Sequence, residues 1–360
     1  MDINIRKDRM TKWERWNAIL NRQTPDRVPV WSFGLGFHAI HAGLSLVEAY
    51  TNAEKVVDAT EKTSAEFGWQ DLPMIGYAAM GAWELGGDVK MPSGQYAQAP
   101  AVIRTPIESE EDVDRLKVPT DISNAGLIPL MLECVRIQVK RGYPLIMGMT
   151  LGPWSFAVNS AGVERVMRWV IKKPDVIHKL EEKVLPFSIQ LLHAFVDTAD
   201  KGRILPWVGG TATSSNQLIS PQVFKEFYIP YMKKLYDEAH KMGLKHIFIH
   251  ICGDQNANLP HWAELDYGDP GLLSFGHEVD LEVAGSYFPN HIIVGNLEPA
   301  ILQVGTSEEV YEATRKVIEK GKRLGPWRFM LAPGCELPPR SPEENVWAMM
   351  QAISDFGWYE

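Results

Sequence analysis

Short apolar runs alternate along the chain with longer segments in which apolar residues recur at helical spacing. In Leu127–Val139, for example, apolar residues repeat at intervals of three and four positions, which is the pattern of an amphipathic helix. Strands that alternate with helices pair in parallel through right-handed crossovers. Eight runs are predicted as strands in 360 residues, which favours an α/β fold of the (β/α)8 TIM barrel type. The runs are Val28–Phe33, Trp69–Ile75, Leu145–Leu151, Ile204–Val208, His246–Cys252, Leu272–Phe275, His291–Val294 and Trp327–Leu331.

Two stretches depart from simple strand–helix alternation. Residues 6–21 have a helical pattern and lead into the first strand, so residues 1–25 are expected to form a helical extension. Residues 76–143 are far longer than one crossover needs, and they contain an acidic helix start at Glu108–Asp114. We interpret this segment as an excursion over the barrel mouth. The prediction is therefore a single domain covering residues 1–360.

The chain carries 36 Lys and Arg against 45 Asp and Glu, a formal charge of −9. It has no dense basic patch, so neither nucleic acid nor an anionic membrane is an expected partner. No run of 18 apolar residues is present, and the first ten residues lack the apolar core of a signal peptide. Three widely separated cysteines do not make a disulfide framework and favour a reducing compartment. The expected location is the cytoplasm.

The tetrapeptide His250–Gly253 ends one of the predicted strands and carries the strongest chemical signal. Side chains alternate along a strand with a period of two, so the isoleucines of this run share one face while His250 and Cys252 share the other. The uniformly aliphatic face suits the surrounding helices, which turns His250 and Cys252 toward the barrel interior. Barrel enzymes place their active sites at this C-terminal end of the strands. A histidine and a cysteine one pleat apart can bind one zinc ion.

A third ligand is needed to bind zinc firmly, and Cys335 is the candidate. It follows the eighth predicted strand, and all strand C-termini open on the same rim of a barrel, so Cys335 is expected to meet Cys252 across the mouth. Cys134 falls instead in the apolar stripe of a helix, where a free cysteine behaves as a small hydrophobe. Three protein ligands leave one position open, as in catalytic zinc sites.

Two thiolates and one neutral imidazole would balance the charge of Zn²⁺, which makes a mild Lewis acid. Such a site is suited to holding a further thiol in its deprotonated form, because free thiols have a pKa near 8.5 and are mostly protonated at neutral pH. Alkyl transfer to or from sulfur, or from an ether oxygen, is the chemistry that this donor set favours.

Several further segments resemble the uroporphyrinogen decarboxylase superfamily, a family of (β/α)8 barrels, along nearly the whole chain. The matching pieces are Glu14-Arg15, Pro25–Trp31, Gly295–Pro299, Leu337–Pro339 and Ser341–Val346. The decarboxylases of this superfamily use an arginine-rich segment after the first strand to bind a macrocycle with many carboxylates. Here that segment is Ser32–His38, which contains no arginine. His250, Cys252 and Cys335 instead match the zinc-dependent corrinoid methyltransferases.

The resemblance implies a zinc-dependent methyltransferase. Its partner would be a separate corrinoid protein, because this chain has no Asp-x-His-x-x-Gly motif for holding cobalamin itself. The other substrate would be a small thiol such as coenzyme M, or a methylated compound such as a methoxylated aromatic, with either direction of transfer open. Two alternatives are kept: a decarboxylase of a smaller carboxylate, and a non-catalytic protein that binds a corrinoid or a thiol.

The resemblance also suggests residues around the reacting centre. An acidic residue at the end of the sixth strand fills the fourth zinc position in similar proteins, so Glu278 is the favoured candidate and His277 the alternative. Only one of the two can face the metal, because alternate residues point to opposite faces. Asp71 lies near the position of an essential aspartate of the decarboxylases. It is expected either to act in catalysis or to cap a loop.

The remaining candidates lie near the ends of other strands. Asn296 and Glu298 follow the seventh strand and are expected either to orient polar groups of the substrate or to satisfy loop amides. Tryptophans near three strand ends are expected to line a flat apolar pocket for an aromatic substrate or the corrin ring, namely Trp31, Trp154 and Trp207.

Overall fold

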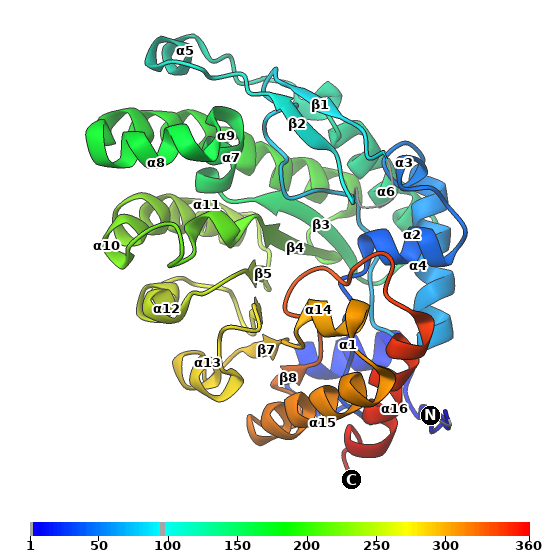
Figure 1. The fold of residues 1–360 in the computed structure, drawn as a ribbon. Coiled ribbons are helices and arrows are strands. Elements are labelled where there is room, and N and C mark those ends of the chain that lie inside the picture. The colour runs from blue at the N-terminus through cyan, green and yellow to red at the C-terminus, as the bar shows by residue number, and fades with distance from the viewer. Residues whose placement is uncertain (1–2, 94–97) are drawn as a thin grey trace.

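The computed structural model describes residues 3–93 and 98–360 of the chain. Its centre is a parallel sheet of six strands in which each strand pairs with the next along the sequence (Figure 1). The strands are β3 (Ile146–Leu151), β4 (Ile204–Gly209), β5 (Phe248–Ile251), β6 (Leu272–Phe275), β7 (Ile292–Val294) and β8 (Phe329–Met330). The sheet curls into the (β/α)8 barrel that the sequence predicts, and these six strands correspond to the last six predicted runs.

The first two predicted strands, Val28–Phe33 and Trp69–Ile75, are wrong as regular strands. The first segment lies beside β8 through a parallel bridge between Val30 and Leu331, and the second lies beside the first, with the Gln70 amide bonded to the Val30 carbonyl. Side chains replace the rest of the ladder. Gln70 Oε1 accepts the Val30 N–H, and Asp71 Oδ1 accepts the Ser32 N–H. These two segments therefore extend the barrel beside β8 through an isolated bridge and side-chain hydrogen bonds, in place of a regular strand ladder.

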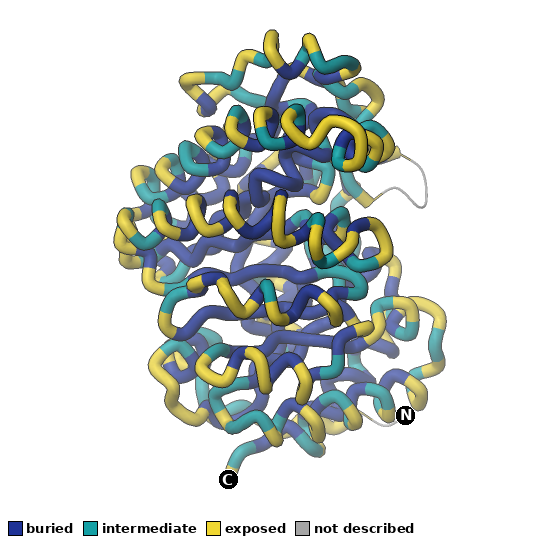
Figure 2. The backbone as a smooth tube through the Cα atoms, turned by 90° about the vertical axis from the view of Figure 1, so that its left-hand side faces the viewer, coloured by how far each residue is buried: buried dark blue, intermediate teal, exposed yellow. Residues whose placement is uncertain are grey.

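Helices surround the barrel, and their outward turns are exposed while the strands they cover are buried (Figure 2). The longer helices pack an apolar face inward, as the periodicity of the sequence predicts. The helices between or after the barrel segments are α2 (Leu35–His41), α3 (Leu46–Ala49), α4 (Ala53–Phe67), α6 (Ile128–Lys140), α7 (Pro153–Ala161), α8 (Val163–Lys172), α9 (Pro174–Ala199), α10 (Pro221–Val223), α11 (Ile229–Lys241), α12 (Leu259–Trp262), α13 (Leu281–Tyr287), α14 (Pro299–Val304), α15 (Ser307–Arg323) and α16 (Glu343–Phe356).

The N-terminal segment is less helical than predicted, because α1 spans only Lys12–Leu20. Thr11 caps its start: the Thr11 hydroxyl accepts the Glu14 N–H, and the Glu14 carboxylate accepts the Thr11 N–H. The preceding Arg9 and Met10 donate their backbone N–H groups to the Asp26 carboxylate, which keeps this stretch out of the helix. The cap therefore sets the boundary that periodicity alone places too early.

Residues 76–143 contain an antiparallel pair, a short helix and then α6. The pair is β1 (Asp88–Lys90) with β2 (Ala101–Arg104), and the short helix is α5 (Glu110–Arg115). Residues 1, 2 and 94–97, which fall within the predicted extension and excursion, lie outside the described residues. The interpretation of the whole chain as one domain, with an excursion over the mouth, stays a prediction. Within the described ranges no helix is long and apolar enough to cross a membrane.

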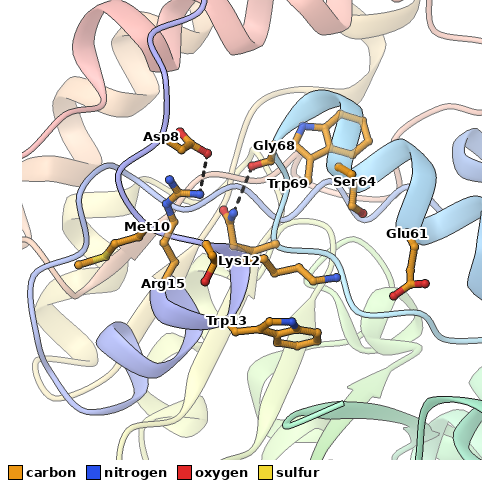
Figure 3. Close-up of a pocket in the computed structure, with 12 residues that line it drawn as sticks. Asp8, Met10, Lys12, Trp13, Arg15, Glu61, Ser64, Gly68 and Trp69 are labelled. Atoms are coloured by element: carbon orange, nitrogen blue, oxygen red, sulfur yellow. Dashed lines mark hydrogen bonds and ion pairs between the residues drawn. The ribbon is translucent and has the colours of Figure 1, made fainter. Parts of the chain in front are cut away.

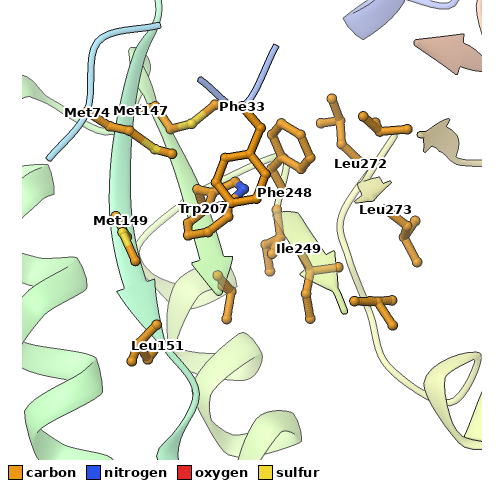
Figure 4. Close-up of a cluster of buried hydrophobic side chains, with 14 of the residues drawn as sticks. Phe33, Met74, Met147, Met149, Leu151, Trp207, Phe248, Ile249, Leu272 and Leu273 are labelled. Carbon is orange, nitrogen blue, oxygen red and sulfur yellow. The ribbon is translucent and has the colours of Figure 1, made fainter. Parts of the chain in front are cut away.

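Buried aromatic, methionine and aliphatic side chains pack around the barrel strands (Figure 4). Phe33 packs against Trp207, and Phe248 packs against Trp31. Met147 lies on the β3 side of these rings. The Trp31 ring lies 4.6 Å from Phe33 and 4.6 Å from Phe248. This packed interior forms a rigid apolar floor beneath the C-terminal ends of the strands.

Candidate metal centre

Three potential metal ligands meet at the C-terminal end of the barrel. His250 lies in β5, Cys252 follows it directly, and Cys335 lies in the loop after β8. One ligand atom from each residue lies within 4.8 Å of the others, and the two Sγ atoms are 3.7 Å apart. Among the described residues, no other group of three or more His, Cys, Asp or Glu side chains brings its ligand atoms this close together.

The His250 ring is held in one orientation by its surroundings. Its Nδ1 lies 3.0 Å from the hydroxyl of Ser274, which is fully buried on the neighbouring β6. The ring stacks nearly parallel to Trp207, with centroids 6.2 Å apart, and meets the edge of Phe33 at 5.0 Å. Nε2 is buried without a hydrogen-bond partner. With Nδ1 donating to Ser274, the lone pair of Nε2 is free to bind a metal.

The two cysteines of the cluster share a hydrogen bond that polarises the pair. The Cys252 thiol donates to Cys335 Sγ. This bond, together with the neighbouring His250 ring, lowers the pKa of Cys335 despite its burial, while the same bond and burial raise the pKa of Cys252. Cys134 is different, because it is buried in α6 and burial raises its pKa to about 12. Of these three cysteines, Cys335 at the barrel mouth is therefore the one whose thiolate form is favoured.

The geometry of the cluster fits a zinc ion. Two sulfurs that each lie about 2.3 Å from one tetrahedral zinc are about 3.8 Å apart, and the two Sγ atoms are separated by 3.7 Å. Two thiols and one imidazole are ligand types that zinc prefers. The buried Nε2 of His250, which has no partner, gains one when a metal binds. The donor set offers three ligands, which leaves a fourth position for a substrate atom.

The loop after β6 brings an acidic group close to the cluster without joining it. Glu278 and His277 are both exposed, and His277 Nδ1 lies 3.6 Å from Glu278 Oε2. A Cβ on Gly276 would lie only 2.5 Å from Glu278 Oε2, so the carboxylate folds back over this glycine. The charge of Glu278 contributes to the raised pKa of Cys252, after the larger effects of Cys335 and burial.

Asp71 is buried, and its carboxylate makes hydrogen bonds within the protein. Its oxygens accept hydrogen bonds from the Ser32 N–H at 2.7 Å and from the Ser32 hydroxyl, and His38 Nε2 lies 2.9 Å away. On the opposite side, Lys12 Nζ donates to the Asp71 carbonyl. These contacts are those of a loop anchor, because they hold Ser32 and His38 at the end of the first barrel segment.

The three predicted rim tryptophans are all buried. Trp31 and Trp207 lie together beneath the cluster, with ring centroids 6.2 Å apart, and each is only 2% exposed. Trp154 is fully buried in α7, where it packs against Phe227 near the start of α11. That the three tryptophans line one substrate pocket stays a prediction.

The two candidates after β7 have different environments. Asn296 is buried, and its Nδ2 donates to the carbonyls of Gly276 at 3.0 Å and Val279 at 2.6 Å. Asn296 therefore holds the loop that carries Glu278. The sequence suggested that it would bond to loop amides, and it bonds to loop carbonyls instead. Glu298 is exposed and precedes α14.

A pocket of about 400 Å³ lies elsewhere, between α1, α4 and the segment around Trp69 (Figure 3). Lys12 lies along it above Trp13, and burial lowers the pKa of Lys12. Its lining contains none of the three residues of the metal cluster. Lys12 connects this pocket to Asp71 through the hydrogen bond to the Asp71 carbonyl.

Residues that the sequence did not single out hold the cluster in place. Ser274 orients His250, and Phe33 packs on its edge with a backbone φ of +48°, a left-handed conformation that is rare for a bulky residue. Thr211 bonds to the backbone around Cys252. A polar residue within the apolar run of β6 is a signal for Ser274. Nothing in the local sequence singles out Phe33 or Thr211.

Comparison with known proteins gives a consistent picture. The family model for uroporphyrinogen decarboxylase (URO-D) matches residues 11–356. The methylcobamide:CoM methyltransferase MtbA of Methanosarcina acetivorans is 28% identical over 96% of this chain and 98% of its own length. A uroporphyrinogen decarboxylase of Anaeromyxobacter sp. is 24% identical over 96% of this chain and 99% of its own. A solved methyltransferase from Methanosarcina mazei superposes with a TM-score of 0.80 at 24% identity, covering 96% of this chain and 99% of the other.

Proposed function

Because the chain belongs to the uroporphyrinogen decarboxylase family, we propose that it is a zinc-dependent methyltransferase that moves a methyl group between a corrinoid protein and a small substrate. The single observation that carries this proposal is the cluster of His250, Cys252 and Cys335 at the C-terminal end of the barrel. The similarity to a methylcobamide:CoM methyltransferase over nearly the full length of both chains supports it. The small substrate is a thiol or a methylated compound such as a methoxylated aromatic.

The residues of the site have different roles in this proposal. His250 Nε2 and the sulfurs of Cys252 and Cys335 hold the metal, and the aromatic floor beneath them excludes water. Bound zinc supplies Lewis acidity that keeps a thiol deprotonated or polarises a methylated heteroatom. In the direction of thiol methylation, the sulfur–carbon bond forms as the cobalt–carbon bond breaks. The electron pair of that bond stays on cobalt, and the thiol proton is released.

Neighbouring groups have supporting roles in this proposal. Glu278 is the carboxylate that competes for the fourth position, because it folds over Gly276 beside Cys252. Asp71 holds the loop after the first barrel segment and need not touch substrate. Cobalamin belongs to a separate corrinoid protein that docks at the barrel mouth. Three cysteines that form no disulfide suit a reducing compartment, so we place the protein in the cytoplasm.

The test is a methyl-transfer assay with methylcobalamin and a panel of thiols, followed by the absorption spectrum of the cobalamin. The proposal expects loss of methylcobalamin with a suitable thiol, and no reaction after chelation or in Cys252→Ser. A decarboxylase of a smaller carboxylate would need Asp71 and tolerate loss of the cysteines. Turnover by Cys252→Ser that is abolished in Asp71→Asn would therefore contradict the proposal. A non-catalytic protein would bind zinc or ligand and turn nothing over.

A further inference from the structure

The backbone of β5 loses one of its strand neighbours at the metal ligands. β4 pairs with β5 only through Trp207 with Phe248 and Val208 with Ile249. Gly210, with a φ of +79°, then turns the chain away from the sheet. On the other side β6 continues, and the Gly276 N–H still bonds to the Ile251 carbonyl. The groups that face β4 are left without a ladder partner.

One hydroxyl makes the two bonds that the missing strand residue would make. Thr211 Oγ1 donates to the His250 carbonyl at 2.7 Å and accepts the Cys252 N–H at 2.7 Å. In a parallel ladder one residue of the neighbouring strand donates to one carbonyl and accepts the N–H two residues further on. A hydroxyl has one proton to donate and lone pairs to accept, so it can do both. Thr211 thus fixes the backbone at His250 in β5 and at Cys252 directly after it.

Thr211 is itself held on several sides. It is fully buried, and its carbonyl accepts hydrogen bonds from the Ser214 hydroxyl at 2.7 Å and from Gln255 Nε2 at 3.4 Å. The same Gln255 amide donates to the Cys252 carbonyl at 3.2 Å. The oxygen of that amide accepts from Asn258 and Trp262. The hydroxyl of Thr211 therefore acts from a rigid base.

We propose that Thr211 is a positioning residue that sets the separation of the His250 and Cys252 ligand atoms and thereby the affinity for zinc. This inference rests on the proposed function. Metal–ligand distances tolerate only about 0.2 Å of change, so a backbone that relaxes at the ligands weakens the site. Groups that orient metal ligands from behind typically change metal affinity by about 10- to 100-fold when they are removed.

The test measures zinc affinity by competition with a chromophoric chelator. Thr211→Ala should weaken zinc binding by about 10- to 100-fold, and Thr211→Ser, which keeps the hydroxyl, should stay within about threefold. Thr150→Val is the matched control, because Thr150 is buried near the end of β3 and, within the described part of the chain, its hydroxyl bonds only to the Leu151 carbonyl. The absorption of bound cobalt(II) should change in Thr211→Ala and not in Thr150→Val.

Wild-type zinc affinity in Thr211→Ala would overturn the inference, and so would an equal loss in Thr150→Val, which would reflect general destabilisation. If Thr211→Ala does not fold, Thr211→Val removes the same hydroxyl and its two bonds while keeping a side chain of similar size. Unchanged zinc affinity in that variant would reject the inference. Equal zinc binding by wild type and Cys252→Ser would instead reject the proposed function, which keeps the two failures distinguishable.

Discussion

His250 illustrates how the environment of one side chain selects its chemistry. Ser274 engages Nδ1, while Nε2 is buried and has no hydrogen-bond partner. An unsatisfied buried polar atom costs about 1–3 kcal/mol, so a purely structural position would favour an apolar residue. The two sulfurs beside the ring explain the unpaired Nε2, because one metal ion bound between them would coordinate all three groups.

Replacing Cys335 by His tests the role of charge at the site. The variant keeps a plausible metal ligand but removes one thiolate charge. A thiol held there would be less nucleophilic, so its methylation should slow by about tenfold or more, which corresponds to at least about 1.4 kcal/mol of barrier. Cleavage of a methyl ether needs stronger Lewis acidity at the departing oxygen and should suffer less. Rates in both directions are compared after metal analysis confirms full zinc occupancy, and wild-type rates in both would show that the metal is not at the reacting centre.

The elements show which parts of the fold the sequence could predict. Six strands follow from apolar runs between helical patterns, and His250 and Cys252 follow from the period of two along β5. The apolar runs also locate the first two barrel segments, but not their irregular pairing, because Gln70 and Asp71 side chains replace backbone partners there. Thr211 escapes prediction for the same reason. Its hydroxyl acts as a strand residue across a gap of 39 positions, and no periodicity records that.

The junction between α1 and the first barrel segment depends on a buried ion pair. Asp26 accepts hydrogen bonds from Arg15 Nε at 2.6 Å and Arg15 Nη2 at 2.9 Å. Burial alone would raise the pKa of Asp26, but Arg15 and the backbone amides of Arg9 and Met10 lower it to about 2. The pKa in the folded state thus lies below the unfolded value of about 3.9. The stabilisation is present above about pH 4 and is lost as the pH falls toward 2.

Asp26→Asn should therefore lower the free energy of unfolding by about 2 kcal/mol at pH 7. The difference from wild type should shrink as the pH falls from about 4 toward 2. Urea unfolding at pH 7 and pH 3 measures this. Glu312→Gln is the control, because its pair with Arg315 is on the surface and should change stability by about 0.5 kcal/mol or less. An equal deficit at both pH values would contradict the account.

At the scale of the whole molecule, the barrel brings together residues that are far apart in sequence. Cys252 and Cys335 are 83 positions apart, yet their sulfurs meet because β5 and β8 open on the same rim. The same rim includes the segment after the first barrel segment, where Ser32 and His38 surround Asp71. Barrel topology could therefore be predicted to gather the metal ligands, while the details of the surrounding loops could not.

The protein should not decarboxylate uroporphyrinogen. That macrocycle carries many carboxylates, and Ser32–His38 contains no arginine to neutralise them. Burying several unpaired carboxylates is strongly unfavourable, so binding should be negligible. A direct assay for coproporphyrinogen checks this prediction. Steady product formation at a rate useful to a cell would refute it.

The central claim is that His250, Cys252 and Cys335 hold one zinc ion, and the metal content of purified protein tests it most directly. Elemental analysis should find about one zinc per chain in the wild type. Cys134→Ser is the matched control, because Cys134 is buried in α6 away from the cluster, and it should keep its zinc. Cys252→Ser and Cys335→Ser should contain strongly reduced zinc. Stoichiometric zinc in both of these variants would contradict the account.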